Sequence, residues 1–137
     1  KDKREDAGDA ITKEGDTIEI KFSIANIKGV TNYVQIRPHY KANFYLLMYY
    51  SPELDILEGF LLSKQEILES IVKFGGYAHG SVKTQGKITL ENILNNSYEY
   101  SIRPNVMKKD DDALKYFREK NLLKEEKYKW MKKIILS

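Results

Sequence analysis

The stretch Ala7–Ser23, AGDAITKEGDTIEIKFS, decides the fold that the sequence predicts. From Thr17 onward it alternates polar and apolar residues, and side chains on a β-strand project to opposite faces with a period of two. One face of this predicted strand is apolar, whereas the other carries Glu19 and Lys21 together. We expect the apolar face to be buried, so that the core holds the two charged side chains rigidly. The apolar positions are Ile18, Ile20, Phe22 and Ile24.

A turn at Glu14–Asp16 predicts that this strand is the second arm of a hairpin, because Gly15 supplies the positive φ that tight turns need. A three-residue loop pairs Lys13 with Thr17 and places Asp9 opposite Lys21, on the polar face. A two-residue loop would instead turn Asp9 away from that face. The alternative to a functional cluster is a surface hairpin whose charges are merely solvated.

Two carboxylates and an amine held on one face suit a divalent cation and an attacking water. The series Gly8-Asp9, turn, Glu19-Ile20-Lys21 resembles the PD-(D/E)xK signature of restriction-endonuclease-like nucleases, with Gly8 where the signature has proline. The resemblance implies that Asp9 and Glu19 bind Mg²⁺, for which Mn²⁺ can substitute, and that Ile20 lends its backbone carbonyl. It also implies that Lys21 orients or activates the hydrolytic water, so that Asp9, Glu19 and Lys21 form the catalytic set.

The resemblance implies one nuclease-like domain over residues 1–137, in an α/β (mixed α+β) class. Its restriction-endonuclease-like core, a central mixed sheet flanked by helices, is expected over residues 8–73. A variable part for DNA recognition is expected over 74–109, and C-terminal helices over 110–137. The family usually has a helix before the Asp. Only eight residues precede Asp9, so we expect that helix to be missing, truncated or outside this sequence.

Local patterns predict most of the remaining elements. Asn32–Tyr40 mixes the two periods, and the resemblance implies a helix there. Lys87–Asn95 fits either a short helix or a strand, and Tyr77–Gln85 is predicted to be a loop. A capping pair, Ser63 with Glu66, opens a helix that ends at Gly75-Gly76, and aspartates open another at Asp110. The predicted strands are Asn43–Tyr50, Asp55–Leu62 and Tyr98–Arg103, and two helices are predicted within Asp110–Ser137.

Polar side chains gather in two further spans, one after the predicted hairpin and one after the glycine pair. Arginine binds phosphate or guanine through two hydrogen bonds, and Asn and Gln can read adenine, so both spans are candidate DNA contacts. Solvated polar segments are the alternative for both, and a strand-end salt bridge is the alternative for the arginine that precedes Pro104. The candidates are Gln35, Arg37, His39, Lys41, Asn43, His79, Ser81, Lys83 and Arg103, of which Gln35 is expected to line the metal site.

Composition excludes several classes of protein. The absence of cysteine excludes a disulfide framework, a thiolate zinc site and a thiol nucleophile. No run of residues is long and apolar enough to span a bilayer, and no signal peptide is visible, so we expect a soluble, cytoplasmic protein. A net charge of +3 permits DNA binding without arguing for it.

These observations favour a magnesium-dependent endonuclease that cuts double-stranded DNA, interpreted as a type II restriction endonuclease of a restriction-modification system. A palindromic target would require a homodimer, for which the terminal helices are the natural interface, or a partner subunit. One alternative is a non-catalytic DNA- or protein-binding module on a similar α+β scaffold. Another is a subunit fragment that acts only with a second chain.

Overall fold

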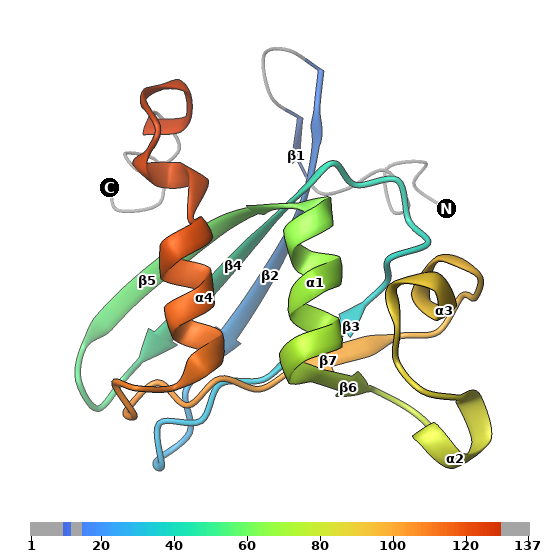
Figure 1. Ribbon diagram of the computed structural model, residues 1–137. Coiled ribbons are helices and arrows are strands. Elements are labelled where there is room, and N and C mark those ends of the chain that lie inside the picture. The colour runs from blue at the N-terminus through green and yellow to red at the C-terminus, as the bar shows by residue number, and fades with distance from the viewer. Residues whose placement is uncertain (1–9, 12–14, 130–137) are drawn as a thin grey trace.

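The amphipathic stretch forms a strand in the computed structural model, which describes residues 10–11 and 15–129 (Figure 1). This strand, β2 (Thr17–Ile24), pairs antiparallel with the two-residue strand β1 (Ala10–Ile11). The pairing places Ile11 opposite Thr17, where Lys13 was predicted. The predicted register was therefore wrong by two residues, and because two is even, Ala10 and Ile11 keep the faces that the prediction gave them.

A four-stranded mixed sheet is built on β2, in the order β1-β2-β4-β5. The strand β4 (Phe44–Ser51) lies parallel to β2, and β5 (Ile56–Ser63) lies antiparallel to β4. The predicted strands Asn43–Tyr50 and Asp55–Leu62 are confirmed to within a residue at each end. Most of β4 is buried, as its nearly continuous apolar sequence predicted.

Two helices, α1 (Lys64–Phe74) and α4 (Asp112–Lys120), pack against one face of this sheet (Figure 1). The predicted caps are present at both. The Ser63 hydroxyl accepts a hydrogen bond from the Glu66 backbone N–H at 3.2 Å, and Asp111 accepts from the first turn of α4. Such caps satisfy backbone N–H groups that have no partner within the helix, which is why these residues fix where the helices begin.

A second sheet has three antiparallel strands in the order β3-β7-β6. The predicted strand Tyr98–Arg103 is confirmed at its centre as β7 (Tyr100–Ile102), between β3 (Tyr33–Ile36) and β6 (Gly75–Tyr77). The helix that the resemblance implied for Asn32–Tyr40 is wrong. Pairing with β7 gives the backbone N–H and C=O groups of this segment hydrogen-bond partners in a strand.

Short elements complete the described chain. The predicted loop Tyr77–Gln85 contains a single helical turn, α2 (Val82–Gln85), and the ambiguous segment after it is helical as α3 (Leu90–Leu94). Where a second C-terminal helix was predicted, the described part has two 3₁₀ turns, η2 (Leu122–Lys124) and η3 (Glu126–Tyr128). Within the described residues, no helix has both the length and the apolarity to cross a membrane.

The main core lies between the four-stranded sheet and the two helices, and it extends onto the second sheet. On β4, the residues that enter this core are Tyr45, Leu47 and Tyr49. Their partners on β2 lie on the same face of the sheet and are the polar ones, Glu19, Lys21 and Ser23. The largest fully buried side chains include Tyr33, Tyr45, Tyr49, Phe60, Tyr100 and Phe117.

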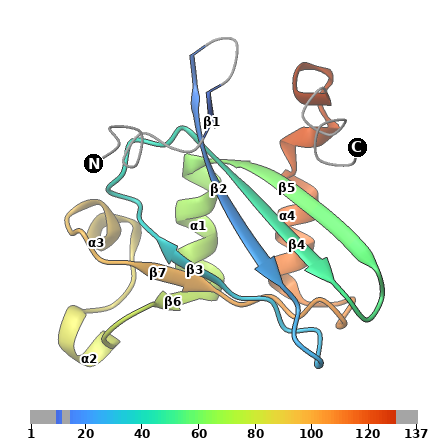
Figure 2. The same cartoon turned by 180° about the vertical axis from the view of Figure 1, so that it is seen from behind.

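The expectation that the apolar face of β2 would be buried is therefore wrong for most of the strand. Ile18 is 1% exposed and packs with Leu46 and Leu61 against the 3₁₀ turns, whereas Phe22 and Ile24 are 57% and 60% exposed. These side chains lie on the outer face of the sheet, which Figure 2 turns toward the viewer with α1 and α4 behind it. The inner face instead half-buries the charged residues of β2.

Candidate active site

The candidate site begins with Glu19 and Lys21 on β2. Two residues apart on a strand, they share one face with about 6.6 Å between their Cα atoms. Both side chains are half-buried on the side of the sheet that carries the helices. Ile20 lies between them and points to the outer face, so its predicted role as a metal ligand concerns its backbone carbonyl and not its side chain.

The third predicted catalytic residue, Asp9, lies outside the described residues. In the described part of the hairpin, Ala10 is opposite Ile18 and Ile11 is opposite Thr17. The grouping of Asp9 with Glu19 and Lys21 therefore stays a prediction.

Lys21 is held by the backbone of Gln35. Its ammonium donates a hydrogen bond to the Gln35 carbonyl oxygen at 2.9 Å. Gln35 has a φ of +57°, and the pairing of β3 with β7 is irregular around it. A residue with a side chain rarely adopts this left-handed conformation, and such departures collect at functional sites. Gln35 lies beside Lys21 and offers it a main-chain oxygen, whereas its predicted place at a metal site stays a prediction.

A small hollow lies next to these groups. It has a volume of about 10 Å³, which is about the room that one water molecule occupies. Burial, followed by the nearby Glu19 carboxylate, raises the pKa of Tyr45 above its ordinary value, so its hydroxyl stays protonated. The hollow is lined by Glu19, Lys21, Gln35, Arg37, Tyr40 and Tyr45.

Arg37 brings a second cation to the hollow. Its Nε donates to Glu99 Oε2 at 2.8 Å, and its guanidinium lies over the Tyr40 ring at 5.4 Å. The hydrogen bond to Glu99 raises the pKa of Arg37, and the same bond lowers the pKa of Glu99. The other oxygen of Glu99 lies 3.4 Å from Nε2 of His79. The structure thus brings together Arg37 and His79, which the sequence placed in separate DNA-contacting spans.

Glu99 was missed by the sequence analysis. It lies directly before β7, and its partner Arg37 is 62 positions away in the chain. No local pattern links the two residues, since a strand-end glutamate is ordinary on any exposed edge. The pairing depends on the order of strands in the second sheet.

The other candidates from the first span have different surroundings. His39 is exposed beside Tyr40, and burial, followed by the charge of Arg37, lowers its pKa. Lys41 has an exposed side chain. The Asn43 side chain accepts hydrogen bonds from the backbone N–H of Thr17 at 2.9 Å and from its hydroxyl at 3.1 Å. Asn43 therefore joins the starts of β2 and β4, which is a structural role.

Two further candidates lie near α2. Ser81 caps this helical turn and exchanges hydrogen bonds with Thr84, whereas Lys83 is exposed on it. Arg103 is not brought to the hollow. It follows the far end of β7, about 13 Å along the strand from Glu99, and lines a separate depression of about 300 Å³ with Lys108 and the aspartates that precede α4.

The oxygen atoms at the site are of the type that binds a hard cation. Carboxylate and backbone carbonyl oxygens, which Glu19 and Ile20 offer, are the ligands that Mg²⁺ prefers. Across residues 10–11 and 15–129, no three His, Cys, Asp or Glu side chains gather as a set that could hold a metal ion. A second carboxylate from Asp9 therefore belongs to the proposal below.

Comparison with known proteins found no matching family model, no matching curated protein and no matching solved structure. The site is therefore interpreted from its own chemistry.

Proposed function

We propose that the chain is a metal-dependent endonuclease that hydrolyses phosphodiester bonds of double-stranded DNA. In this proposal it has a restriction-endonuclease-like core and acts as a type II restriction endonuclease. The observation that carries the proposal is the placement of Glu19, Lys21 and Arg37 around one water-sized hollow. A carboxylate, an ammonium and a guanidinium there match the needs of phosphodiester hydrolysis, which are a cation, an oriented water and a clamp on the phosphate.

In this proposal Glu19, the Ile20 carbonyl and Asp9 hold Mg²⁺. When bound, the cation supplies Lewis-acid stabilisation of the phosphate charge and lowers the pKa of a bound water. Glu19 suits the role of ligand because its half-buried position limits the water that competes for its charge.

Lys21 orients the attacking water. The hydrogen bond to the Gln35 carbonyl fixes the direction of its side chain and uses one of the three N–H groups of an ammonium. The water oxygen forms a bond to phosphorus, the bond from phosphorus to one sugar oxygen breaks, and that oxygen takes up a proton. Arg37 binds the non-bridging oxygens, whose negative charge the hollow must accommodate.

The experiment is cleavage of supercoiled plasmid with and without Mg²⁺. The variants Glu19→Gln and Lys21→Ala should each reduce cutting by about a hundredfold or more, with DNA binding retained. Asp9→Ala tests the predicted second ligand in the same assay. Glu53→Gln and Lys115→Ala make the same chemical changes at exposed positions that do not line the hollow and should cut as the parent does. Parental cutting by Glu19→Gln or Lys21→Ala refutes the proposal.

A second candidate function is a non-catalytic DNA-binding module. The convergence of Arg37 and His79 on one carboxylate favours it, because the N–H groups of an arginine and a histidine on neighbouring loops suit phosphate binding without any chemistry. Binding of duplex DNA that needs no metal and leads to no cutting would support this alternative. Recognition of a palindrome by either version would require two copies of the chain.

A further inference from the structure

Glu99 lies at the point where three strands of the second sheet meet. Arg37 directly follows β3, His79 comes two residues after β6, and Glu99 directly precedes β7. Because β7 runs antiparallel to both neighbours, the ends of β3 and β6 lie beside its start. The central strand thus supplies a carboxylate between an arginine and a histidine that follow its flanking strands.

The backbone fixes this arrangement on both sides. Ile36, directly before Arg37, is paired with Tyr100, directly after Glu99. On the other side, the N–H of Ala78 donates to the Glu99 carbonyl at 2.9 Å. Arg37 and His79 are therefore each one residue away from a backbone contact with the Glu99 segment. The carboxylate can hold the Arg37 side chain, which donates a hydrogen bond to it, in a set direction.

The contact with Glu99 does not involve the part of the Arg37 guanidinium that binds phosphate best. Glu99 receives the Nε–H, and the other four N–H groups of a guanidinium belong to its two terminal nitrogens. Paired N–H groups of this kind bind two phosphate oxygens at once. The same side chain lines the hollow beside Glu19 and Lys21, so the phosphate that it meets is the one placed for attack.

We propose that Glu99 is a positioning residue that aims Arg37 at the scissile phosphate. This inference rests on the proposed nuclease function. A carboxylate beside a phosphate site repels DNA, so Glu99 weakens ground-state binding while it fixes the geometry that the reaction needs. Removing the carboxylate should therefore strengthen binding and slow cleavage, whereas the loss of a purely structural residue should weaken both.

The test uses Glu99→Gln, which keeps the shape of the side chain and removes its charge. We expect this variant to bind a 20-bp duplex at least as tightly as the parent, with a plot of log affinity against log salt that is steeper by up to about one unit. Its single-turnover cleavage rate should fall about tenfold or more, because Arg37 loses its fixed direction. In an Arg37→Ala background, Glu99→Gln should change the cleavage rate much less.

The chain offers a matched control in Glu58, which pairs with Arg118 at 3.1 and 3.2 Å. Glu58→Gln breaks a similar pair between a carboxylate and an arginine, and neither residue lines the hollow, so binding and cleavage should stay parental. The positioning role is overturned if Glu99→Gln cleaves at the parental rate. It is also overturned if binding and cleavage in Glu99→Gln fall together with thermal stability, because that is the pattern of a purely structural role.

The outcomes also separate this inference from the proposed function. A parent that binds DNA without cutting it refutes the nuclease, and the binding measurement then decides the role of Glu99. In that case, tighter binding and a steeper salt dependence in Glu99→Gln support a carboxylate that restrains the phosphate contacts. Weaker binding or an unchanged salt dependence in Glu99→Gln overturns this role of Glu99.

Discussion

Two adjacent glycines at the end of α1 should respond in opposite ways to the same substitution. Gly75 and Gly76 begin β6, and both were predicted from the sequence only as the end of a helix. A Cβ added at Gly75 would lie 2.9 Å from Cα and O of Ile71 and 2.9 Å from the Ser101 carbonyl oxygen. A Cβ added at Gly76 would meet nothing within 4 Å.

The difference can be given a magnitude. Carbon atoms pack best at about 3.5–4.0 Å, so Gly75→Ala forces a shift of about half an ångström or more. All three contacting atoms belong to the backbone of α1 or β7, so no side-chain rotation relieves the overlap. Overpacking of this kind costs about 1–3 kcal/mol. Gly76→Ala restricts the unfolded chain without a clash and should stabilise the protein by about 0.4–1 kcal/mol.

Urea denaturation followed by circular dichroism measures both variants. With a denaturant slope of about 1–3 kcal/mol per molar, Gly75→Ala should lower the midpoint by about 1 M, and Gly76→Ala should leave it unchanged or raise it. Each variant is the control for the other, because they are neighbours and undergo the same chemical change. Equal midpoints, or a lower midpoint for Gly76→Ala, would refute the close packing of α1 on β7.

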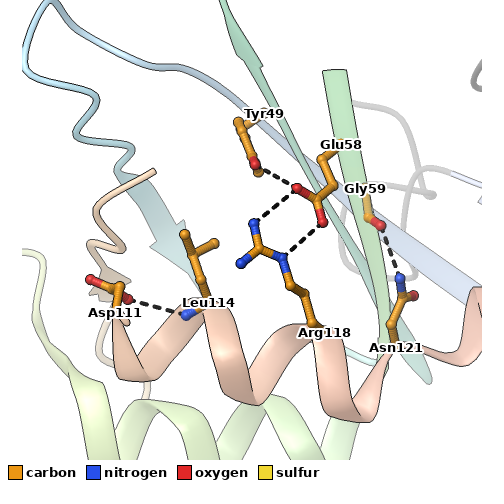
Figure 3. Close-up of polar contacts among 7 residues, drawn as sticks. All are labelled: Tyr49, Glu58, Gly59, Asp111, Leu114, Arg118 and Asn121. Carbon is orange, nitrogen blue, oxygen red and sulfur yellow. Dashed lines mark hydrogen bonds and ion pairs between the residues drawn. The ribbon is translucent and has the colours of Figure 1, made fainter. Parts of the chain in front are cut away.

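Three further predictions concern stability, pH and metal. The Asn121 side chain accepts a hydrogen bond from the Leu61 backbone N–H on β5 at 2.9 Å and donates one to the Gly59 carbonyl at 3.2 Å, the second of which Figure 3 shows. In urea denaturation, Asn121→Ala should therefore lower the free energy of unfolding by about 2 kcal/mol, whereas the exposed Asn95→Ala should change it little. Burial alone would raise the pKa of Glu58, but hydrogen bonds from Arg118 and Tyr49 outweigh it and lower the pKa below its ordinary value (Figure 3). This stabilisation is present above the unfolded pKa and is lost as pH falls through the folded pKa, so between about pH 5 and pH 3 the parent should lose more unfolding free energy than Glu58→Gln. If the proposed metal site exists, Mg²⁺ at a hundredfold excess over its dissociation constant should raise the free energy of unfolding by about 2.7 kcal/mol. EDTA should remove this increase, and Glu19→Gln should not show it.

The elements that the sequence predicted well have signals within a few residues. The strand β4 follows from a continuous apolar run, and the start of α1 follows from Ser63 and Glu66. The start of α4 follows from Asp111, which accepts hydrogen bonds from the N–H groups of Ala113 and Leu114, the second of which Figure 3 shows. In each case the atoms that decide the structure are close neighbours in the chain.

The wrong predictions concern features that depend on segments far apart in the chain. Alternation on β2 predicts which residues share a face, but it does not predict which face meets the helices. That choice depends on the parallel pairing with β4 and on the side of the sheet where α1 and α4 pack. In the same way, β3 is a strand because β7 lies beside it, and Glu99 enters the site because β7 is the central strand.

The two clearest departures from local rules lie at the same place. On β2 the charged side chains face the core while Phe22 and Ile24 face outward, so the strand gives up apolar burial that the opposite orientation would provide. Gln35 adopts a left-handed conformation that a glycine would adopt more easily. Both departures serve one contact, since the inward direction of Lys21 and the turned carbonyl of Gln35 are what their 2.9 Å hydrogen bond requires. Departures from local rules that meet at one contact are expected where a site positions a side chain, so this combination supports the proposed role of Lys21 beside the hollow.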